Sequence, residues 1–236
     1  MESHKGRLLT GWRELAYEIG IIVAGVLIAL IAQQVVEEWS WRQKVASARA
    51  AMDLEIKNSL LAAYESNKLQ RCQARQLDVV QASIVAGDWP RAAAGLSQGS
   101  ILSFRFWGEE AFAAMISGQT SDHLATATMS DYSSVYTMIR KNRQHQEEIW
   151  ATQPILAMMA IPSLPTTPDV RLKELEAITR VSDGLSQIVS QGGALSDLAK
   201  TQLGLSVGEA DYRKAPGRTE MLAKCEAAAA LGKPAR

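Results

Sequence analysis

Apolar residues are spread unevenly along this chain, with one continuous run near its start and periodic patterns after it. No polar side chain occurs from residue 19 to residue 32, and the run continues to Val36 with two glutamines inside it. A helix of these 18 residues is about 27 Å long at about 1.5 Å per residue, close to a hydrocarbon core of about 30 Å. We therefore predict a short tail over residues 1–18, a transmembrane helix over 19–36 and an extramembrane domain over 37–236.

Tryptophans lie on both sides of the predicted span, as is typical of residues at membrane–water interfaces. Trp12 precedes it, and Trp39 and Trp41 follow it. Two alternatives remain open, a cleavable signal peptide and a helix buried in a soluble domain. Against the first, Leu30-Ile31-Ala32 is a poor cleavage site and helix-forming residues continue beyond it. Against the second, the run has no polar face.

Small residues recur at helical spacing within the span, at Gly20, Ala24, Gly25 and Ala29. Rows of small residues let two helices approach closely in lipid. These four residues are therefore a candidate packing face for a homo-oligomer. The alternative is that glycine and alanine are simply common in transmembrane helices.

A helical period dominates the rest of the chain. Residues 41–86 contain neither proline nor glycine, and apolar residues recur at every third or fourth position, which predicts one long helix ended by Gly87. A second long helix is expected from about residue 123 to 160, capped by Ser121 or Asp122. Shorter helices are expected within 91–108, over 109–116 (ended by Gly118), 169–190 (ended by Gly192-Gly193), 194–203 and 219–231, with a proline-rich connection at Pro162, Pro165 and Pro168.

No stretch alternates convincingly as a strand, and alanine and leucine favour helix. The sequence therefore predicts an all-α fold, in which the transmembrane helix is followed by an antiparallel helical bundle built on two long helices.

Charge and cysteine content narrow the function classes. The chain has 25 basic and 25 acidic residues, so it lacks the basic excess of a nucleic-acid-binding protein. Its two cysteines, Cys72 and Cys225, cannot form a cysteine-rich zinc site. In an oxidising compartment they are a candidate disulfide between the first long helix and the C-terminal helix. The alternative is that both are small buried residues.

The basic residues that flank the span do not choose its orientation. Lys5, Arg7 and Arg13 precede it, and Arg42, Lys44 and Arg49 follow it within a similar distance. The positive-inside rule compares the number of basic residues on the two sides of a span. Because there are three on each side here, the rule leaves the topology undecided. The default for an uncleaved N-terminal anchor is a short cytoplasmic tail and an exported domain.

Motifs in a context that supports catalysis or cofactor binding are missing from the sequence. There is no HExxH, SxxK or glycine-rich phosphate loop, and the GxSxG match at residues 95–99 does not follow a predicted strand, as a nucleophile elbow requires. His145 and Glu148 share a helix face, but a lone pair does not make a metal site. We therefore expect a non-enzymatic protein without cofactor or metal. The densest aromatic cluster, at Phe104, Phe106, Trp107 and Phe112, is either a ligand pocket or partner patch, or part of the core.

The stretch "GVLIALIAQQVVEEWSWRQKV", residues 25–45, resembles the start of a family of uncharacterised proteobacterial single-pass inner-membrane proteins. The likeness continues more thinly to about residue 80, through Glu55, Asn58, Cys72, Arg75 and Leu77, and again at Trp107, Ala111 and Gly118. Some relatives have Asn-Trp-Asn after the span, whereas this chain has Glu-Trp-Ser at residues 38–40. The resemblance implies an inner-membrane anchor and a periplasmic helical domain, and it implies no activity.

Two functions are compatible with these patterns. The first is a membrane-anchored, non-enzymatic helical protein that contacts the lipid bilayer through its span and binds a protein or envelope partner through its domain. The second is a ligand-sensing periplasmic bundle. Because the tail of 18 residues is too short for an output module, that protein would signal through a partner.

Overall fold

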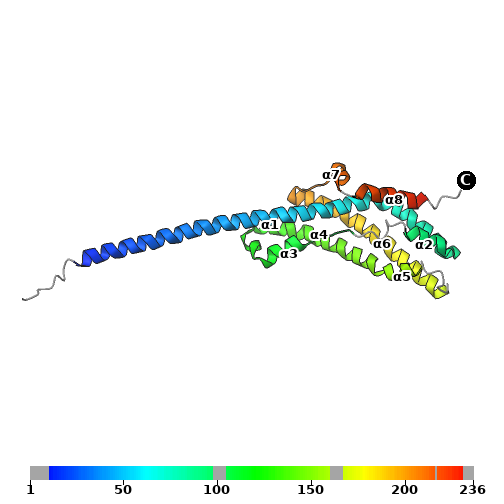
Figure 1. The fold of residues 1–236 in the computed structure, drawn as a ribbon, viewed down its shortest axis with the longest axis horizontal. Helices are drawn as coiled ribbons and strands as arrows, with labels where there is room; N and C mark the ends of the chain where they lie inside the picture. The colour runs from blue at the N-terminus through cyan, green and yellow to red at the C-terminus, as the bar shows by residue number, and fades with distance from the viewer. Residues whose placement is uncertain (1–10, 98–104, 160–166, 216, 231–236) are drawn as a thin grey trace, which may run out of the picture. The chain divides into compact units, whose positions relative to one another are not determined.

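The computed structural model describes residues 11–97, 105–159, 167–215 and 217–230 (Figure 1). The fold is all-α, and these residues contain no strand. The chain divides into two compact units, Met1–Ser47 and Ala48–Arg236. The elements are α1 (Gly11–Ala86), α2 (Trp89–Ser97), α3 (Glu110–Ser117), the 3₁₀ turn η1 (Thr120–His123), α4 (Thr126–Ala151), α5 (Gln153–Met158), α6 (Pro168–Leu198), the π-helical turn η2 (Ala199–Leu203), α7 (Glu209–Lys214) and α8 (Arg218–Ala230).

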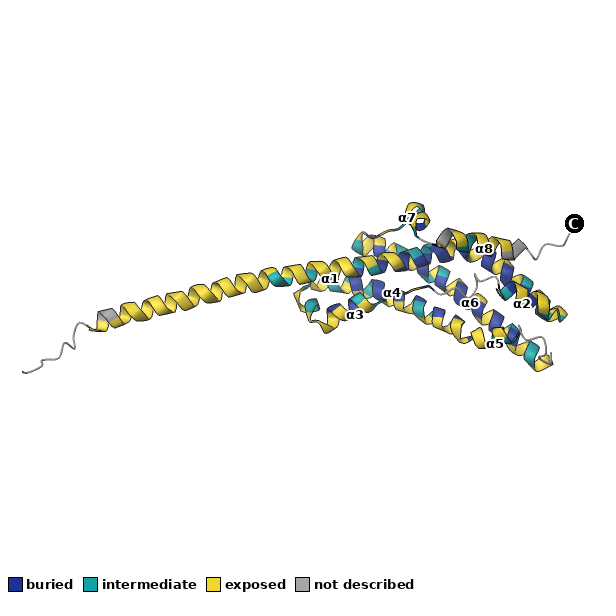
Figure 2. Ribbon diagram, viewed as in Figure 1, coloured by how far each residue is buried: buried dark blue, intermediate teal, exposed yellow. Residues whose placement is uncertain are grey.

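Helix α1 contains both the apolar run and the first long helix predicted after it. It continues for 76 residues because no proline interrupts it. It ends where Gly87 adopts a left-handed conformation with φ of 75°, the usual role of glycine after a helix. In the first unit, almost every side chain that the structure describes is exposed (Figure 2).

The second unit is a helical bundle formed by the later part of α1 with α4 and α6 (Figure 1). Helix α6 is antiparallel to α4, because His145 contacts Gln191 whereas Ile149 contacts Gly184. The Tyr132 hydroxyl donates a hydrogen bond to Asp53, and the Tyr136 hydroxyl donates one to Glu55. Because the contacts advance along both helices together, α1 and α4 run in the same direction. The core lies between these helices and contains Met52, Ile56, Leu60, Val135, Ile139, Ile149, Val181, Ile188 and Leu195.

The predicted helix break at Gly192-Gly193 is wrong, because α6 passes through both glycines. A Cβ on Gly192 would lie 2.9 Å from the Ala63 side chain of α1, whereas a Cβ on Gly193 would meet nothing within 4 Å. Gly192 therefore permits close packing of two helices instead of ending one. Similarly, a Cβ on Gly184 would lie 2.7 Å from Ile149 of α4.

The predicted boundaries of the second long helix need two corrections. Ser121 and Asp122 lie in η1 and do not cap the helix, which begins at Thr126 after Ala125. The helix ends at Ala151 rather than near residue 160, and α5 follows. Pro154 lies in the first turn of α5. Proline has no backbone N–H, so it is tolerated in a first turn but would interrupt a continuous helix here.

The remaining short elements are close to expectation, with one addition. Helix α3 matches the predicted 109–116, and α8 matches 219–231 within the described residues. Helix α7 is not predicted, although Asp211 accepts a hydrogen bond from the Gly208 N–H at 2.9 Å and so stabilises its first turn. Pro168 begins α6, while Pro162 and Pro165 lie outside the described residues.

Candidate functional site

The predicted membrane span is an exposed part of α1. This helix is long and apolar enough to cross a membrane, and no residue of its most apolar 18-residue window is buried. Large exposed apolar surfaces on a soluble monomer are rare, so this run is a candidate membrane span. Trp12 and Trp39 are also exposed. Trp41 is half-buried, and the Lys44 Nζ lies 4.2 Å from its ring centroid.

The small residues of the predicted packing face, Gly20, Ala24, Gly25 and Ala29, are all exposed. Neither Gly20 nor Gly25 has another atom within 4 Å of the place where a Cβ would be. This face therefore has room for a second helix.

Cys72 of α1 and Cys225 of α8 form a disulfide across 153 residues of sequence, with their Cα atoms 5.8 Å apart. Both cysteines are buried in a small cluster with Leu69, and Met221 and Leu222 of α8 pack against it. This cluster is separate from the main core. The disulfide therefore holds the C-terminal helix on the bundle.

The structure decides between the two interpretations of the aromatic cluster for the residues that it describes. Trp107 and Phe112 belong to the hydrophobic core, and the Phe112 ring stacks on Tyr136 with centroids 4.5 Å apart. Phe106 is exposed, and Phe104 lies outside the described residues. The residues expected to form a pocket or partner patch are thus divided between the interior and the surface.

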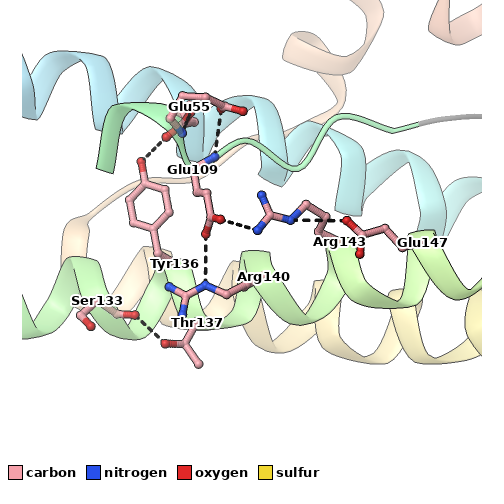
Figure 3. A network of polar contacts seen from close by, with 9 residues as sticks. Glu55, Glu109, Ser133, Tyr136, Thr137, Arg140, Arg143 and Glu147 are labelled. Atoms are coloured by element: carbon pink, nitrogen blue, oxygen red, sulfur yellow. Dashed lines mark hydrogen bonds and ion pairs between the residues drawn. The ribbon is translucent and has the colours of Figure 1, made fainter. Parts of the chain in front are cut away.

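Glu55 is the centre of a polar network that attaches α3 to the bundle (Figure 3). Its carboxyl accepts hydrogen bonds from the backbone N–H of Glu110 at 2.9 Å and from the Tyr136 hydroxyl at 2.7 Å. It also accepts from the N–H of Ala111 at 3.2 Å. A side chain of α1 therefore satisfies the free N–H groups at the start of α3. Burial raises the pKa of Glu55, and the same burial raises the pKa of Tyr136.

Glu109 connects the same region to α4 (Figure 3). It forms ion pairs with Arg140, at 3.1 Å, and with Arg143. Hydrogen bonds from Arg143 and Arg140 hold the pKa of Glu109 below its usual value. Glu55 and Glu109 therefore join α1, the α3 region and α4.

A second junction attaches α7 to α1. Glu209 accepts a hydrogen bond from the Tyr64 hydroxyl at 2.8 Å and forms ion pairs with Lys68 at 2.7 Å and Arg213 at 2.9 Å. Hydrogen bonds from these three groups, of which Lys68 contributes most, lower the pKa of Glu209 to about 2. The Tyr64 and Tyr212 rings lie beside this junction, with centroids 5.6 Å apart.

Helices α4 and α6 also border a groove of about 360 Å³, which we call the α4–α6 groove. Its ionisable lining residues are His145, Glu148, Arg180 and Asp183, and Ala151, Gly184 and Gln187 complete the lining. The His145 Nδ1 lies 3.2 Å from a Glu148 oxygen, and its Nε2 lies 2.9 Å from the Gln191 amide nitrogen. The described residues contain no group of three or more side chains placed to hold a metal ion.

Two buried charged features are not predicted from the sequence. Glu65 and Arg105 form an ion pair at 3.6 Å with both side chains almost fully buried. Glu174 of α6 is fully buried, and within the described parts of the chain neither of its oxygens has a hydrogen-bond partner. The one available signal is positional, because Glu174 precedes the buried Ala177 and Ile178 by three and four residues and so lies on the core-facing side of α6.

No protein-family model, curated protein or solved structure matches this chain.

Proposed function

We propose that this chain is a single-pass inner-membrane protein of bacteria, whose helical domain lies in the periplasm and binds a protein or another component of the envelope. The observation that carries the proposal is the exposed apolar run of α1, which supports an anchor. An anchor of this kind keeps the domain close to partners at the membrane.

The disulfide between Cys72 and Cys225 supports the periplasmic location. Disulfides persist in oxidising compartments such as the periplasm and are rare in the bacterial cytosol. This argument is independent of the flanking charges, which are equal in number on the two sides of the span.

A non-enzymatic role is supported by the way the polar side chains are used. The carboxyls of Glu55, Glu109 and Glu209 are all engaged in junctions between helices. A catalytic acid or base needs a position from which it can reach a substrate, and these junctions hold their carboxyls against the protein itself.

The first experiment tests the topology. Alkaline phosphatase, which is active only after export, is fused to the C-terminus of the full chain, and a fluorescent protein that is active only in the cytoplasm is fused there in a parallel strain. We expect phosphatase activity and no fluorescence. Fluorescence without phosphatase activity would contradict the periplasmic proposal and would direct the search to cytoplasmic partners.

The second experiment tests partner binding. The full chain, carrying a photoactivatable cross-linker at the exposed Trp150 or Leu172, is irradiated in cells, and cross-linked products are identified. A specific product that forms from one of these positions supports a partner. Self-cross-links alone would favour a homo-oligomer, for which the exposed face at Gly20, Ala24, Gly25 and Ala29 is the candidate contact.

The α4–α6 groove favours a second function, ligand sensing through a partner protein. Arg180 can pair with a carboxylate, and Glu148 and Asp183 can pair with an amine, so the groove suits a small zwitterion. Thermal unfolding with a panel of amino acids tests this function. A ligand that raises Tm in the wild type but not in Arg180→Ala supports sensing, and an unchanged Tm across the panel argues against it.

A further inference from the structure

Glu174 is an ionisable residue placed where a charge is unfavourable. Its side chain is fully buried on the core-facing side of α6, among residues that include Ala177, Ile178 and Val181. Neither carboxyl oxygen has a hydrogen-bond partner among the residues that the structure describes. A buried carboxylate without a partner is strongly destabilising, whereas the neutral acid is much easier to bury.

No ion pair of Glu174 is seen among the residues that the structure describes, and burial is the only influence on its pKa. Helix α5 has no ionisable residue. Arg171, three residues before Glu174, is half-buried; its Nε is buried without a hydrogen-bond partner among the described residues, and its guanidinium lies near Gly87. The other ionisable residues of the segments around the first half of α6 are exposed, namely Arg75 and Asp78 of α1, Asp88, Arg91 of α2, and Lys173, Glu176 and Arg180 of α6.

We propose that Glu174 is a proton-binding residue through which the packing of α6 against the rest of the domain responds to pH. With the proton bound, the side chain is neutral and α6 packs as the structure shows. When the proton leaves, the carboxylate must gain water or a positive partner. Both require the first half of α6 to move away from the core.

The direction of the response follows from burial. Burial alone raises the pKa of Glu174 from 4.5 to about 7, which is a proton affinity about 300-fold above that of an exposed glutamate. The folded state therefore binds this proton more tightly than the unfolded state. Its contribution to stability is fully present below pH 4.5 and is lost as the pH rises to about 7.

Movement of α6 would uncover apolar residues of the core. Leu156 and Met159 follow α4 along the chain, and Ala177 and Ile178 lie one turn after Glu174; all four are buried. Their exposure near neutral pH, and their protection in acid, would change the surface offered to a partner. This consequence rests on the proposed function, because a periplasmic domain is exposed to the external pH. Proton binding by Glu174 does not rest on the proposed function.

Purified full-length protein in lipid nanodiscs tests the proposal. Hydrogen–deuterium exchange, corrected for the intrinsic effect of pH on exchange, is measured at several pH values from about 5 to about 9. The variants are Glu174→Gln and Glu174→Leu, and the matched control is Glu176→Gln, an exposed glutamate on the same helix. We expect exchange in residues 168–181 to increase severalfold across neutral pH in the wild type and the control, and to stay flat in both Glu174 variants.

Infrared spectroscopy of the wild-type protein keeps the test decisive if either variant folds poorly. The carbonyl band of a buried protonated carboxyl should disappear near pH 7, where exposed carboxyls have long been ionised. Because burial also raises the pKa of Glu55, the same band should be present in Glu55→Gln. A Glu174 carboxyl that titrates near pH 4.5, or parallel exchange profiles in the wild type and Glu174→Gln, would overturn the proposal. Both measurements are independent of compartment and partner, so their failure is distinct from a failure of the proposed function.

Discussion

Gly192 of α6 lies so close to Ala63 of α1 that a Cβ on Gly192 would be 2.9 Å from the Ala63 side chain. Both residues are buried. The contact lies where two helices far apart in the sequence pack against each other, and only the missing side chain of glycine permits it. The neighbouring Gly193 has open space around it. Packing therefore excludes a side chain at Gly192 but not at Gly193.

Substitution of these glycines should therefore have opposite effects on stability. Gly192→Ala should lower the free energy of unfolding by about 1–3 kcal/mol, because the added methyl group separates the helices. Gly193→Ala should raise it by up to about 1 kcal/mol, because alanine favours helix. Urea denaturation of both variants measures the difference, and equal effects would show that the helices do not pack closely at this point.

Removal of the disulfide should loosen α8 more than the rest of the bundle. Cys72→Ser with Cys225→Ser removes a cross-link over 153 residues, which chain-entropy arguments value at about 5 kcal/mol. Because this cluster is separate from the main core, residues 218–230 should lose hydrogen-exchange protection first. A non-reducing gel establishes the bond, and unchanged protection after reduction would show that packing alone holds α8.

Loss of the Glu109 ion pairs should weaken the attachment of the α3 region to α4. Glu109→Gln should cost about 1 kcal/mol, because the side chain is only partly exposed and has two arginine partners. Glu147→Gln is the control, since that exposed glutamate approaches Arg143 only at 3.9 Å. The free energy of unfolding of each variant gives the comparison.

The same carboxyl should contribute to the pH dependence of stability. The pKa of Glu109 is lowered in the folded state. Its contribution is therefore present above the ordinary glutamate value of 4.5 and is lost as the pH falls below it. The difference in Tm between wild type and Glu109→Gln should shrink in acid, and a constant difference would exclude an electrostatic origin.

A charge in the span should prevent stable insertion. Leu27→Lys places an ammonium near the middle of the apolar run, at a cost of about 3 kcal/mol. Leu54→Lys is the matched control, because Leu54 is an exposed leucine on the same helix but outside the run. Membrane fractionation after carbonate extraction should find less Leu27→Lys than wild type, whereas Leu54→Lys should remain in the pellet. Equal retention would contradict a transmembrane role for this run.

Local patterns predicted much of the architecture. The absence of proline and glycine from residue 41 to residue 86 predicted the second half of α1, and Gly87 and Gly118 follow helices as expected. Prediction failed where a residue acts on a distant segment. Its local sequence makes Gly192 look like a helix breaker, but its role depends on close contact with Ala63. Ser121 looks like a helix cap, but it lies in the short turn η1 before α4.

Site prediction was weaker for the same reason. The cysteines were an obvious pair, because only two are present. For Trp107 and Phe112 the sequence favoured the core but left a patch open, since composition does not tell which way a side chain points. Glu55, Glu109 and Glu174 all read as ordinary helix glutamates, and only their burial and partners distinguish them.

The sequence by itself determined the apolar run, the helical class of the fold and the approximate extent of most helices, because these depend on residues close together in the chain. The tertiary structure decided which glycines end a helix and which allow two helices to pack closely. It also decided which aromatic rings are buried and which glutamates are shielded from water. Those properties depend on the neighbours that a residue acquires across the bundle, and residues such as Ala63 and Gly192 become neighbours only when the chain has folded.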